Sequence, residues 1–249
     1  MFTKRMLILA LVFAYTGIEQ AFWTGIYPTC ISFTQKLGTN TNALLALNSV
    51  AAGLGQVAAG LTFGILGTRT RRIGRDAIVF MGAVLHLLTF AMIYMNIPDN
   101  APLQKTTDCG GILSPSVAIA LVCGGLLGFG DACWNTQIYS FLCDRYSDRS
   151  SEAFAIFKFY QSLLSCAVFF YSSLLKLSWH LLILLVTSLT AAVCFFLIER
   201  FASPVRVEET PDAEAPLNLK RIDYRPKISS SVPDVTVTTD EARKHKDSK

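Results

Sequence analysis

The sequence has little charge. Only 16% of its 249 residues are Asp, Glu, Lys or Arg, whereas about a quarter is usual in soluble domains. The charged residues gather in short islands and in the C-terminal tail, and apolar runs of about twenty residues separate the islands. This distribution argues against a water-soluble fold and predicts a helical protein that crosses a membrane several times.

Several motifs are also absent. The seven cysteines form no Cys-x-x-Cys pair and have no zinc-ligand spacing with histidine, and no Asn-x-Ser/Thr glycosylation sequon occurs. No Gly-x-Ser-x-Gly elbow, His-Glu-x-x-His pair or phosphate-binding glycine loop occurs either, so we expect neither an enzyme nor a bound cofactor. The net charge of +4 comes mainly from loops, where membrane topology explains it, so nucleic-acid binding is not expected.

What the sequence does contain is six apolar runs that are long enough to span a bilayer as helices. We therefore predict an all-α membrane protein with a domain of six transmembrane helices over residues 1–200. The first run is too long for a signal peptide and is interrupted by polar residues. The proline-rich, polar segment 201–249 predicts a disordered tail. The expected spans cover approximately residues 6–33, 43–66, 77–95, 116–142, 153–175 and 179–198.

The loop between the second and third runs is the most basic of all the loops. Four arginines occur between Arg69 and Arg75, so the positive-inside rule places this loop in the cytoplasm. With six crossings, both termini then lie in the cytoplasm, whereas the long loop 96–115 lies outside. The sequence does not distinguish the plasma membrane from an endomembrane.

The fourth run contains polar residues where lipid would tolerate none. Asp131 lies near its middle, where a charge costs about 3 kcal/mol or more unless it has a partner or a wet cavity. Gly124 and Gly128 have the small-x-x-x-small spacing that lets a second helix approach closely. We therefore expect this helix to face protein or an internal cavity.

The polar residues divide the six runs into two groups of three. In each group the first two runs are rich in polar residues and the third is almost entirely apolar. A three-plus-three repeat whose third helices face lipid would give this distribution, as in each half of a major facilitator transporter. The bilayer is then one partner of this chain.

The polar residues of these runs predict an intramembrane network. Asp131 lies roughly 15 Å and Lys158 roughly 9 Å from the cytoplasmic ends of their helices, a gap that a lysine stem can close, so we expect the two to face each other. This pair would be either a functional site or a purely structural bridge. Glu19 has no cation at its depth, and His86 is interpreted as an ordinary interfacial histidine. The expected network consists of Glu19, Gln20, Asp131, Asn135, Gln137, Lys158 and Gln161, with interhelical hydrogen bonds from Asn135 and Gln137.

The cysteines are mostly interpreted as small buried thiols. Cys123, Cys133, Cys166 and Cys194 lie within apolar runs, where burial is the ordinary role of a free thiol. Cys30 and Cys109 both fall near the non-cytoplasmic side, and they are the candidates for a disulfide bond.

Two further motifs point to a family. The sequence resembles the UNC-93-like family of the major facilitator superfamily, and the resemblance covers residues from about 6 to 200. It is carried by Tyr15-Thr16-Gly17, by Gly25-Ile26-Tyr27-Pro28 and by the string from Gly128 through Asp131 to Gln137.

The basic loop is a weaker match to the loop motif of that superfamily. Gly67, Arg72, Gly74 and Arg75 fit it, but Arg71 stands where the family has an aspartate. This departure puts in doubt the charge relay by which such loops hold the cytoplasmic face closed.

The resemblance implies a twelve-span fold, of which this chain matches the C-terminal half. A splice product, a truncated gene model and a half-transporter that dimerises would each account for the length, and a second six-span half or another membrane protein is the implied partner. The family implies a non-enzymatic regulator or escort of other membrane proteins such as ion channels. A secondary transporter of a small solute is the alternative.

Overall fold

The computed structural model describes residues 4–65 and 74–201. Within these residues the structure is helical, without a β-sheet, and six helical spans are long and apolar enough to cross a membrane. The all-α membrane fold predicted from the sequence is confirmed. The expected disordered tail lies outside the described residues, apart from Phe201 at the end of the last helix. The helices are α1 (Lys4–Ala21), η1 (Phe22–Ile26), α2 (Tyr27–Phe33), η2 (Gln35–Leu37), α3 (Thr41–Ile65), α5 (Arg75–Asn96), α6 (Val117–Arg145), η3 (Ser147–Arg149), α7 (Ser150–Ser172) and α8 (Leu177–Phe201).

The first span is one continuous helix with a wider turn in its middle. Between α1 and α2 the chain forms the π-helical turn η1, and the N–H of Tyr27 donates to the carbonyl oxygen of Phe22, five residues earlier. Pro28 follows directly and has no N–H for the helical ladder. Single π turns within α-helices are frequent at functional sites. The sequence did not predict this turn.

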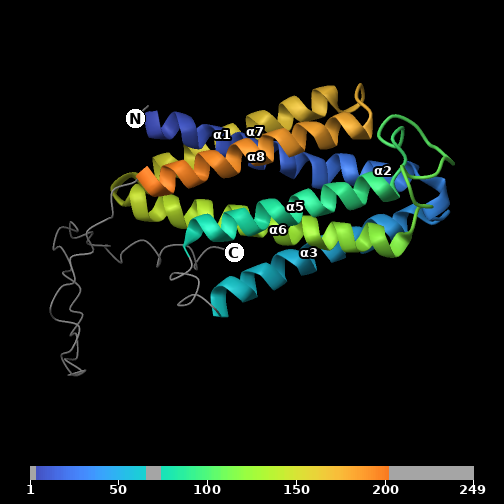
Figure 1. Ribbon diagram of the computed structural model, residues 1–249, viewed down its shortest axis with the longest axis horizontal. Helices are drawn as coiled ribbons and strands as arrows, with labels where there is room; N and C mark the ends of the chain where they lie inside the picture. The colour runs from blue at the N-terminus through green and yellow to red at the C-terminus, as the bar shows by residue number, and fades with distance from the viewer. Residues whose placement is uncertain (1–3, 66–73, 202–249) are drawn as a thin grey trace, which may run out of the picture. The chain divides into compact units, whose positions relative to one another are not determined.

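The packing of the first three spans is the same as that of the last three when spans one, two and three are matched with four, five and six (Figure 1). The first span packs against the fifth and sixth through α1, α7 and α8, and the fourth span α6 packs in the same way against the second and third, α3 and α5. The third and sixth spans, α5 and α8, pack against each other. The contacts therefore have the symmetry that a three-plus-three repeat requires.

The distribution of exposure differs from the expected one. We expected the third helix of each group to face lipid, but α3 and α7 are the most exposed spans, with only 17% and 22% of their apolar windows buried. The corresponding share is 44% for α5 and 33% for α8. Each of these helices packs extensively on two long helices, α5 on α6 and α8 and α8 on α1 and α5, whereas α3 packs mainly on α6 and α7 mainly on α1. A low content of polar residues indicated a lipid-facing helix, but in this bundle packing position decides exposure.

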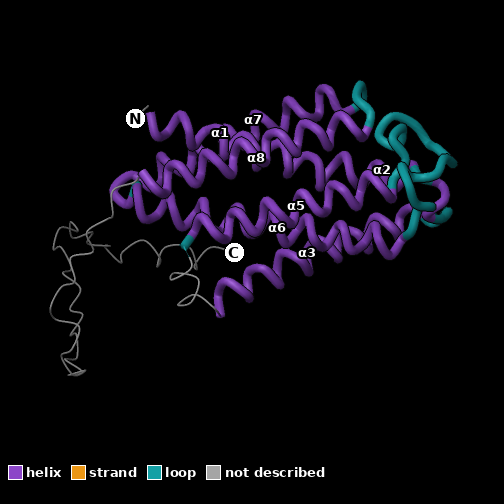
Figure 2. The backbone as a smooth tube through the Cα atoms, viewed as in Figure 1, coloured by secondary structure: helices purple, strands orange, loops and turns teal. Residues whose placement is uncertain are grey.

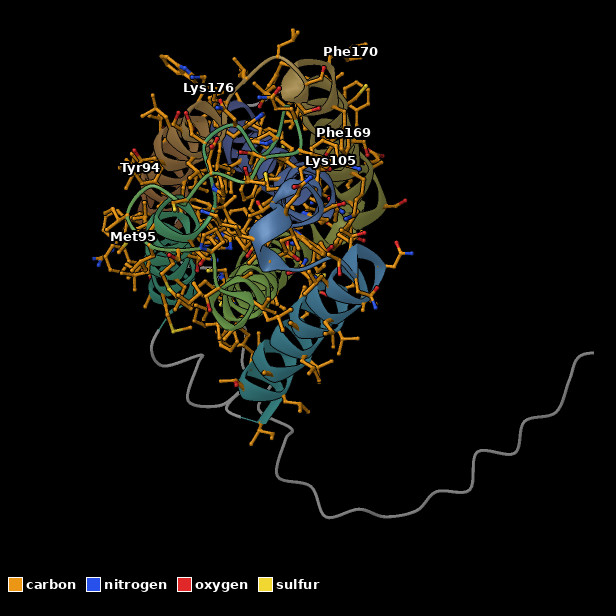
Figure 3. The ribbon with its side chains drawn as sticks, turned by 90° about the vertical axis from the view of Figure 1, so that its right-hand side faces the viewer. Tyr94, Met95, Lys105, Phe169, Phe170 and Lys176 are labelled. Carbon is orange, nitrogen blue, oxygen red and sulfur yellow. The ribbon has the colours of Figure 1, made fainter. Side chains whose placement is uncertain are left out.

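Glycines allow the closest helix contact. A Cβ on Gly55 would lie 2.0 Å from the carbonyl oxygen of Gly125, and one on Gly128 would lie 2.1 Å from that of Ala52. A Cβ on Gly124 would lie 2.2 Å from Oδ1 of Asn48. The close approach predicted for Gly124 and Gly128 is confirmed, and the partner helix is α3. Beyond this contact α3 tilts away from the other helices toward its C-terminal end (Figures 1 and 3).

The connections after α2, α5 and α7 lie together at the end of the bundle opposite the start of α5 (Figure 2), which we call the Asp99 end. There the carbonyl oxygen and Oδ1 of Asp99 accept hydrogen bonds from the N–H groups of Leu177 and Ser178 at the start of α8. Thr106 pairs with the chain after α2, its N–H donating to the carbonyl oxygen of Phe33. The loop after α5 also folds back on that helix, close to Tyr94 and Met95 (Figure 3). This end is therefore well ordered by backbone hydrogen bonds.

A polar cluster within the helical bundle

Polar side chains from α1, α3, α5 and α6 meet in the middle of the bundle. Asp131 is the acidic residue in the middle of α6, and its two carboxylate oxygens accept hydrogen bonds from different side chains. Nε2 of Gln56 on α3 donates to Oδ2 at 3.0 Å, and Nδ2 of Asn135, one turn along α6, donates to Oδ1 at 2.7 Å. Asp131 is 8% exposed, so this carboxyl group is removed from lipid and held by two amide donors.

Glu19 is the second buried acid of this cluster. It lies on α1 and is 1% exposed, and its Oε1 is 3.5 Å from Nε2 of His86 on α5, which is fully buried. The other ring nitrogen of His86 is hydrogen-bonded to the hydroxyl of Tyr15, and Nε2 also lies 3.4 Å from the carbonyl oxygen of Leu127. The tautomer that satisfies both nitrogens has Tyr15 donating to Nδ1 and the Nε2 proton directed between Leu127 and Glu19.

The sequence interpretation of His86 was wrong in this respect. It is no interfacial histidine, because it lies eleven residues into α5, or about 16 Å from the end of the helix. His86 is also the polar neighbour of Glu19 that the sequence analysis did not find. A Cβ on Gly130 would lie 2.2 Å from Nε2 of His86, so the glycine beside Asp131 makes room for the ring. Its depth in the third run was the signal that could have revealed it.

His86 connects the surroundings of the two acids, because its Nε2 lies beside Glu19 and fills the Cβ position of Gly130, the residue before Asp131. Two unit charges 4 Å apart repel by about 4 kcal/mol at the effective dielectric constant of 20 that suits protein sites. Among the described residues, the cluster has more acceptors than donors, since Oε1 of Glu19 and Oδ1 of Asn135 are buried and no described group donates to them. We name the group of Tyr15, Glu19, Gln56, His86, Asp131 and Asn135 the acidic cluster.

The expected contact between Asp131 and Lys158 is not formed. Within the described residues, no ion pair joins the two side chains. Nζ of Lys158 instead donates to Oε1 of Gln161 at 2.7 Å and to the hydroxyl of Tyr139 at 3.3 Å, and it lies over the ring of Phe157. Tyr139 is eight residues beyond Asp131, about 12 Å along α6, so Lys158 is held at a different depth from the carboxylate.

The amides of the fourth span do not bond as expected. Asn135 donates to Asp131 within its own helix, and Nε2 of Gln137 lies 3.3 Å from the hydroxyl of neighbouring Thr136. The interhelical hydrogen bond to the carboxylate comes from Gln56, which the sequence analysis had left out of the network. Side-chain direction around α6, which no spacing rule gives, decides these partners.

A second polar feature opens on the outside of the bundle, between α1 and α7. It is a recess of about 620 Å³ that contains the expected Gln20. Ser165 at its wall donates to the carbonyl oxygen of Gly17 at 2.7 Å, which fixes α7 against α1. Phe169 and Phe170 border it on α7 (Figure 3). We call this feature the α1–α7 recess; its lining residues are Gln20, Ala21, Thr24, Ser162, Ser165, Cys166, Phe169 and Phe170.

The basic loop motif is described only in its last part, since Gly67, Arg71 and Arg72 lie outside the described residues. Gly74 has φ +96°, a conformation that suits glycine, and Arg75 follows as the first residue of α5. Arg75 donates from Nε and Nη2 to Oε1 of Glu199 at 3.2 and 3.0 Å and from Nη1 to Asp144. The last arginine of the motif therefore joins α5, α6 and α8, although the expected aspartate is replaced by Arg71.

The expected disulfide is not formed. Cys30 is buried within α2 and free, whereas Cys109 is exposed and lies 3.0 Å from Nζ of Lys36. Cys123, Cys133 and Cys194 are buried as expected, but Cys166 is exposed at the recess, which corrects that prediction. Its position on the open side of α7, rather than the polarity of the run, decides this.

Comparisons with known proteins place the chain in a family. Residues 1–196 match the family described as "Ion channel regulatory protein UNC-93". Over 199 residues the chain is 43% identical to the UNC93-like protein MFSD11 of Xenopus laevis. The aligned region covers 79% of this chain and 44% of the frog protein.

More distant relatives are similar over the same region. The chain is 28% identical over 188 residues to the UNC93-like protein 3 of Arabidopsis thaliana, covering 73% of this chain and 36% of the plant protein. It is 27% identical over 210 residues to the human protein unc-93 homolog A, and the aligned region covers 82% of this chain and 40% of the human protein. It therefore spans less than half the length of these relatives. No solved structure matches the chain. The family match, the identity to MFSD11 and the six apolar helical spans together show that the chain belongs to the UNC-93 family of multi-pass membrane proteins.

Proposed function

We propose that this chain is a non-enzymatic regulator or escort of other membrane proteins, such as ion channels, and that it contacts them through the α1–α7 recess. The observation that carries the proposal is the position of the recess, which is open on the outside of the bundle at membrane depth. Its hydroxyl and amide side chains would be poorly solvated by lipid, whereas the polar side chains of a second protein would match them.

Such a contact would gain a modest free energy from each polar pair. Interhelical hydrogen bonds in membranes contribute about 0.6–2 kcal/mol each, and the aromatic rings of Phe169 and Phe170 add contact area at the edge of the recess. The matching family is described as an ion channel regulatory protein family, which agrees with this mode of action. A second six-helix bundle is the other implied partner of the recess.

The native Cys166 gives a direct test, because it is exposed in the recess. In a variant with Cys109→Ser and Cys143→Ser, a photoactivatable thiol reagent on Cys166 is expected to crosslink a membrane-spanning protein in cells. The matched control adds Cys166→Ser and Val193→Cys, since Val193 is exposed on α8 and outside the recess. Mass spectrometry then identifies the crosslinked product.

A second readout connects contact with regulation. Ser162→Phe fills the recess and is expected to reduce the crosslink at least tenfold and to change the surface level of the identified protein, whereas Val193→Phe leaves both unchanged. Only lipid adducts at Cys166, as at the control position, would contradict the proposal. A crosslink to a second copy of this chain would make the recess a self-association surface instead.

A transporter is the second candidate, and the acidic cluster favours it, because buried ionisable groups mark ion and proton pathways in membrane proteins. Uptake into proteoliposomes distinguishes the two. A saturable flux that Asp131→Asn abolishes would favour transport. The absence of a flux, together with the crosslink described above, supports the regulator.

A further inference from the structure

The residues of the acidic cluster are not among those that line the recess, and the cluster has no part in the proposed function. Glu19 on α1 and Asp131 on α6 are both buried, and His86 lies between their helices, with Nε2 3.5 Å from Oε1 of Glu19 and in the space where Gly130, the residue before Asp131, would carry a side chain. Among the described residues, Oε1 of Glu19 has no hydrogen-bond donor. A carboxylate in such a position lacks both solvent and a countercharge. An unpaired buried acceptor of this kind calls for a cation or a proton.

The other elements packed around the cluster supply no full countercharge in contact with it. α5 contributes His86, and α1 contributes Tyr15 beside Glu19. Lys158 of α7 acts on Asp131 only from a distance, since its ammonium group bonds Gln161 and Tyr139. α6 also places the Cys133 thiol near Asp131, whereas α3 and α8 contribute Gln56 and Ser188, which do not titrate.

We propose that Glu19 and Asp131 form a binding site for one proton, which the two carboxyl groups share. Asp131 already accepts from Gln56 and Asn135, so it is the better carboxylate of the pair. The proton then sits on Glu19, whose O–H donates to Asp131. Binding forms one O–H bond on a carboxylate and release breaks it, with no redox step.

A proton is a better occupant than a metal ion. Among the described residues, no group of three or more His, Cys, Asp or Glu side chains is placed to hold a metal. The neighbouring amide groups turn their nitrogens, not their oxygens, toward Asp131. A proton needs only the two carboxyl oxygens, and His86 with Tyr15 offers a hydrogen-bonded route by which it could move.

The bound proton fastens α1 to α6. When it leaves, two adjacent negative charges repel, and α1 is the element able to respond, because the π turn η1 begins three residues after Glu19. Binding and release of the proton would therefore control how tightly the first span packs against α6. The site is independent of which protein occupies the α1–α7 recess.

Infrared spectroscopy of the purified full chain in lipid nanodiscs tests the site. A protonated carboxylic acid has a carbonyl stretch separate from that of a carboxylate and of amides, and this band shifts in D₂O. We expect the native chain to show such a band at neutral pH and to lose it reversibly as the pH rises. Glu19→Gln should abolish the band, whereas Glu152→Gln, at an exposed position at the start of α7, should leave it unchanged.

Asp131→Asn provides a second variant in case Glu19→Gln does not fold. It should keep the band but shift it, because a carboxamide is a weaker acceptor than a carboxylate. A native chain without any carboxylic-acid band near neutral pH would overturn the proposal. So would a band that Glu19→Gln leaves intact, or one that sodium ions abolish at constant pH, which would indicate a cation site.

Discussion

Gly130 shows at the scale of one residue how the acidic cluster is accommodated. It precedes Asp131 on α6, and the ring of His86 occupies the space where its side chain would be. The position of the His86 ring beside Glu19 therefore depends on the absence of a single carbon atom at residue 130. In contrast, Gly60 of α3 has no atom within 4 Å of its Cβ position.

These two glycines give a matched pair of variants. Gly130→Ala should destabilise the chain by about 1–3 kcal/mol, because the added methyl group overpacks the site and forces His86 away from Glu19. Gly60→Ala should be neutral or slightly stabilising, because alanine is the better helix former. Thermal unfolding in detergent, followed by the loss of monodisperse protein, measures the difference. Equal midpoints for the two variants would contradict the packing.

At the scale of the elements, Arg75 holds three helices together at its end of the bundle. Its guanidinium makes two hydrogen bonds to Glu199 on α8 and one to Asp144 on α6, and it lies 5.6 Å from the centre of the Phe141 ring. The side chains of Arg75 and Glu199 are 19% and 20% exposed, whereas that of Asp144 is 58% exposed. The two acids are therefore not equivalent.

Charge-assisted hydrogen bonds in such a position contribute about 1.5–3 kcal/mol, whereas exposed ion pairs contribute about 0–1 kcal/mol. We expect Glu199→Gln to lower the unfolding temperature clearly more than Asp144→Asn, and Arg75→Gln to have at least the larger of the two effects. Arg149→Gln, at an exposed position after α6, is the control. A larger loss from Asp144→Asn would show that the pair with α6 dominates.

At the scale of the whole molecule, the even number of spans places both ends of the membrane domain on the same side. The Arg75 end carries the start of α5, the end of α8 and the connection from α6 to α7, whereas the connections after α2, α5 and α7 lie at the Asp99 end. By the positive-inside rule, the basic loop before Arg75 predicts that this end lies in the cytoplasm. Two exposed native cysteines mark the two ends, Cys143 near the end of α6 and Cys109 in the loop after α5.

Labelling with a membrane-impermeant thiol reagent tests this orientation. If the Arg75 end is cytoplasmic, intact cells that carry the chain in the plasma membrane, or sealed right-side-out vesicles, should label Cys109 and leave Cys143 unlabelled until the membrane is permeabilised. Cys109→Ser should remove the signal from intact cells, and Cys143→Ser should leave it unchanged. The reverse pattern would invert the topology.

The sequence by itself determined the six spans, the burial of Asp131 and the close helix contact at Gly124 and Gly128. Each of these follows from local physics, since a bilayer selects long apolar helices, a buried charge is costly and two adjacent helices need small residues. The family resemblance was also readable, because it rests on short strings such as Gly128 to Gln137.

Only the tertiary structure decided which polar groups meet. The sequence analysis paired Asp131 with Lys158 because the two lie at similar depths. The orientation of each helix about its axis instead places Gln56 as the donor to Asp131 and Gln161 as the acceptor from Lys158. It likewise brings His86 beside Glu19 and leaves α3 and α7 more exposed than α5 and α8. Composition and spacing fix how deep a residue lies in the membrane, whereas its partners depend on which face of each helix packs against which neighbour.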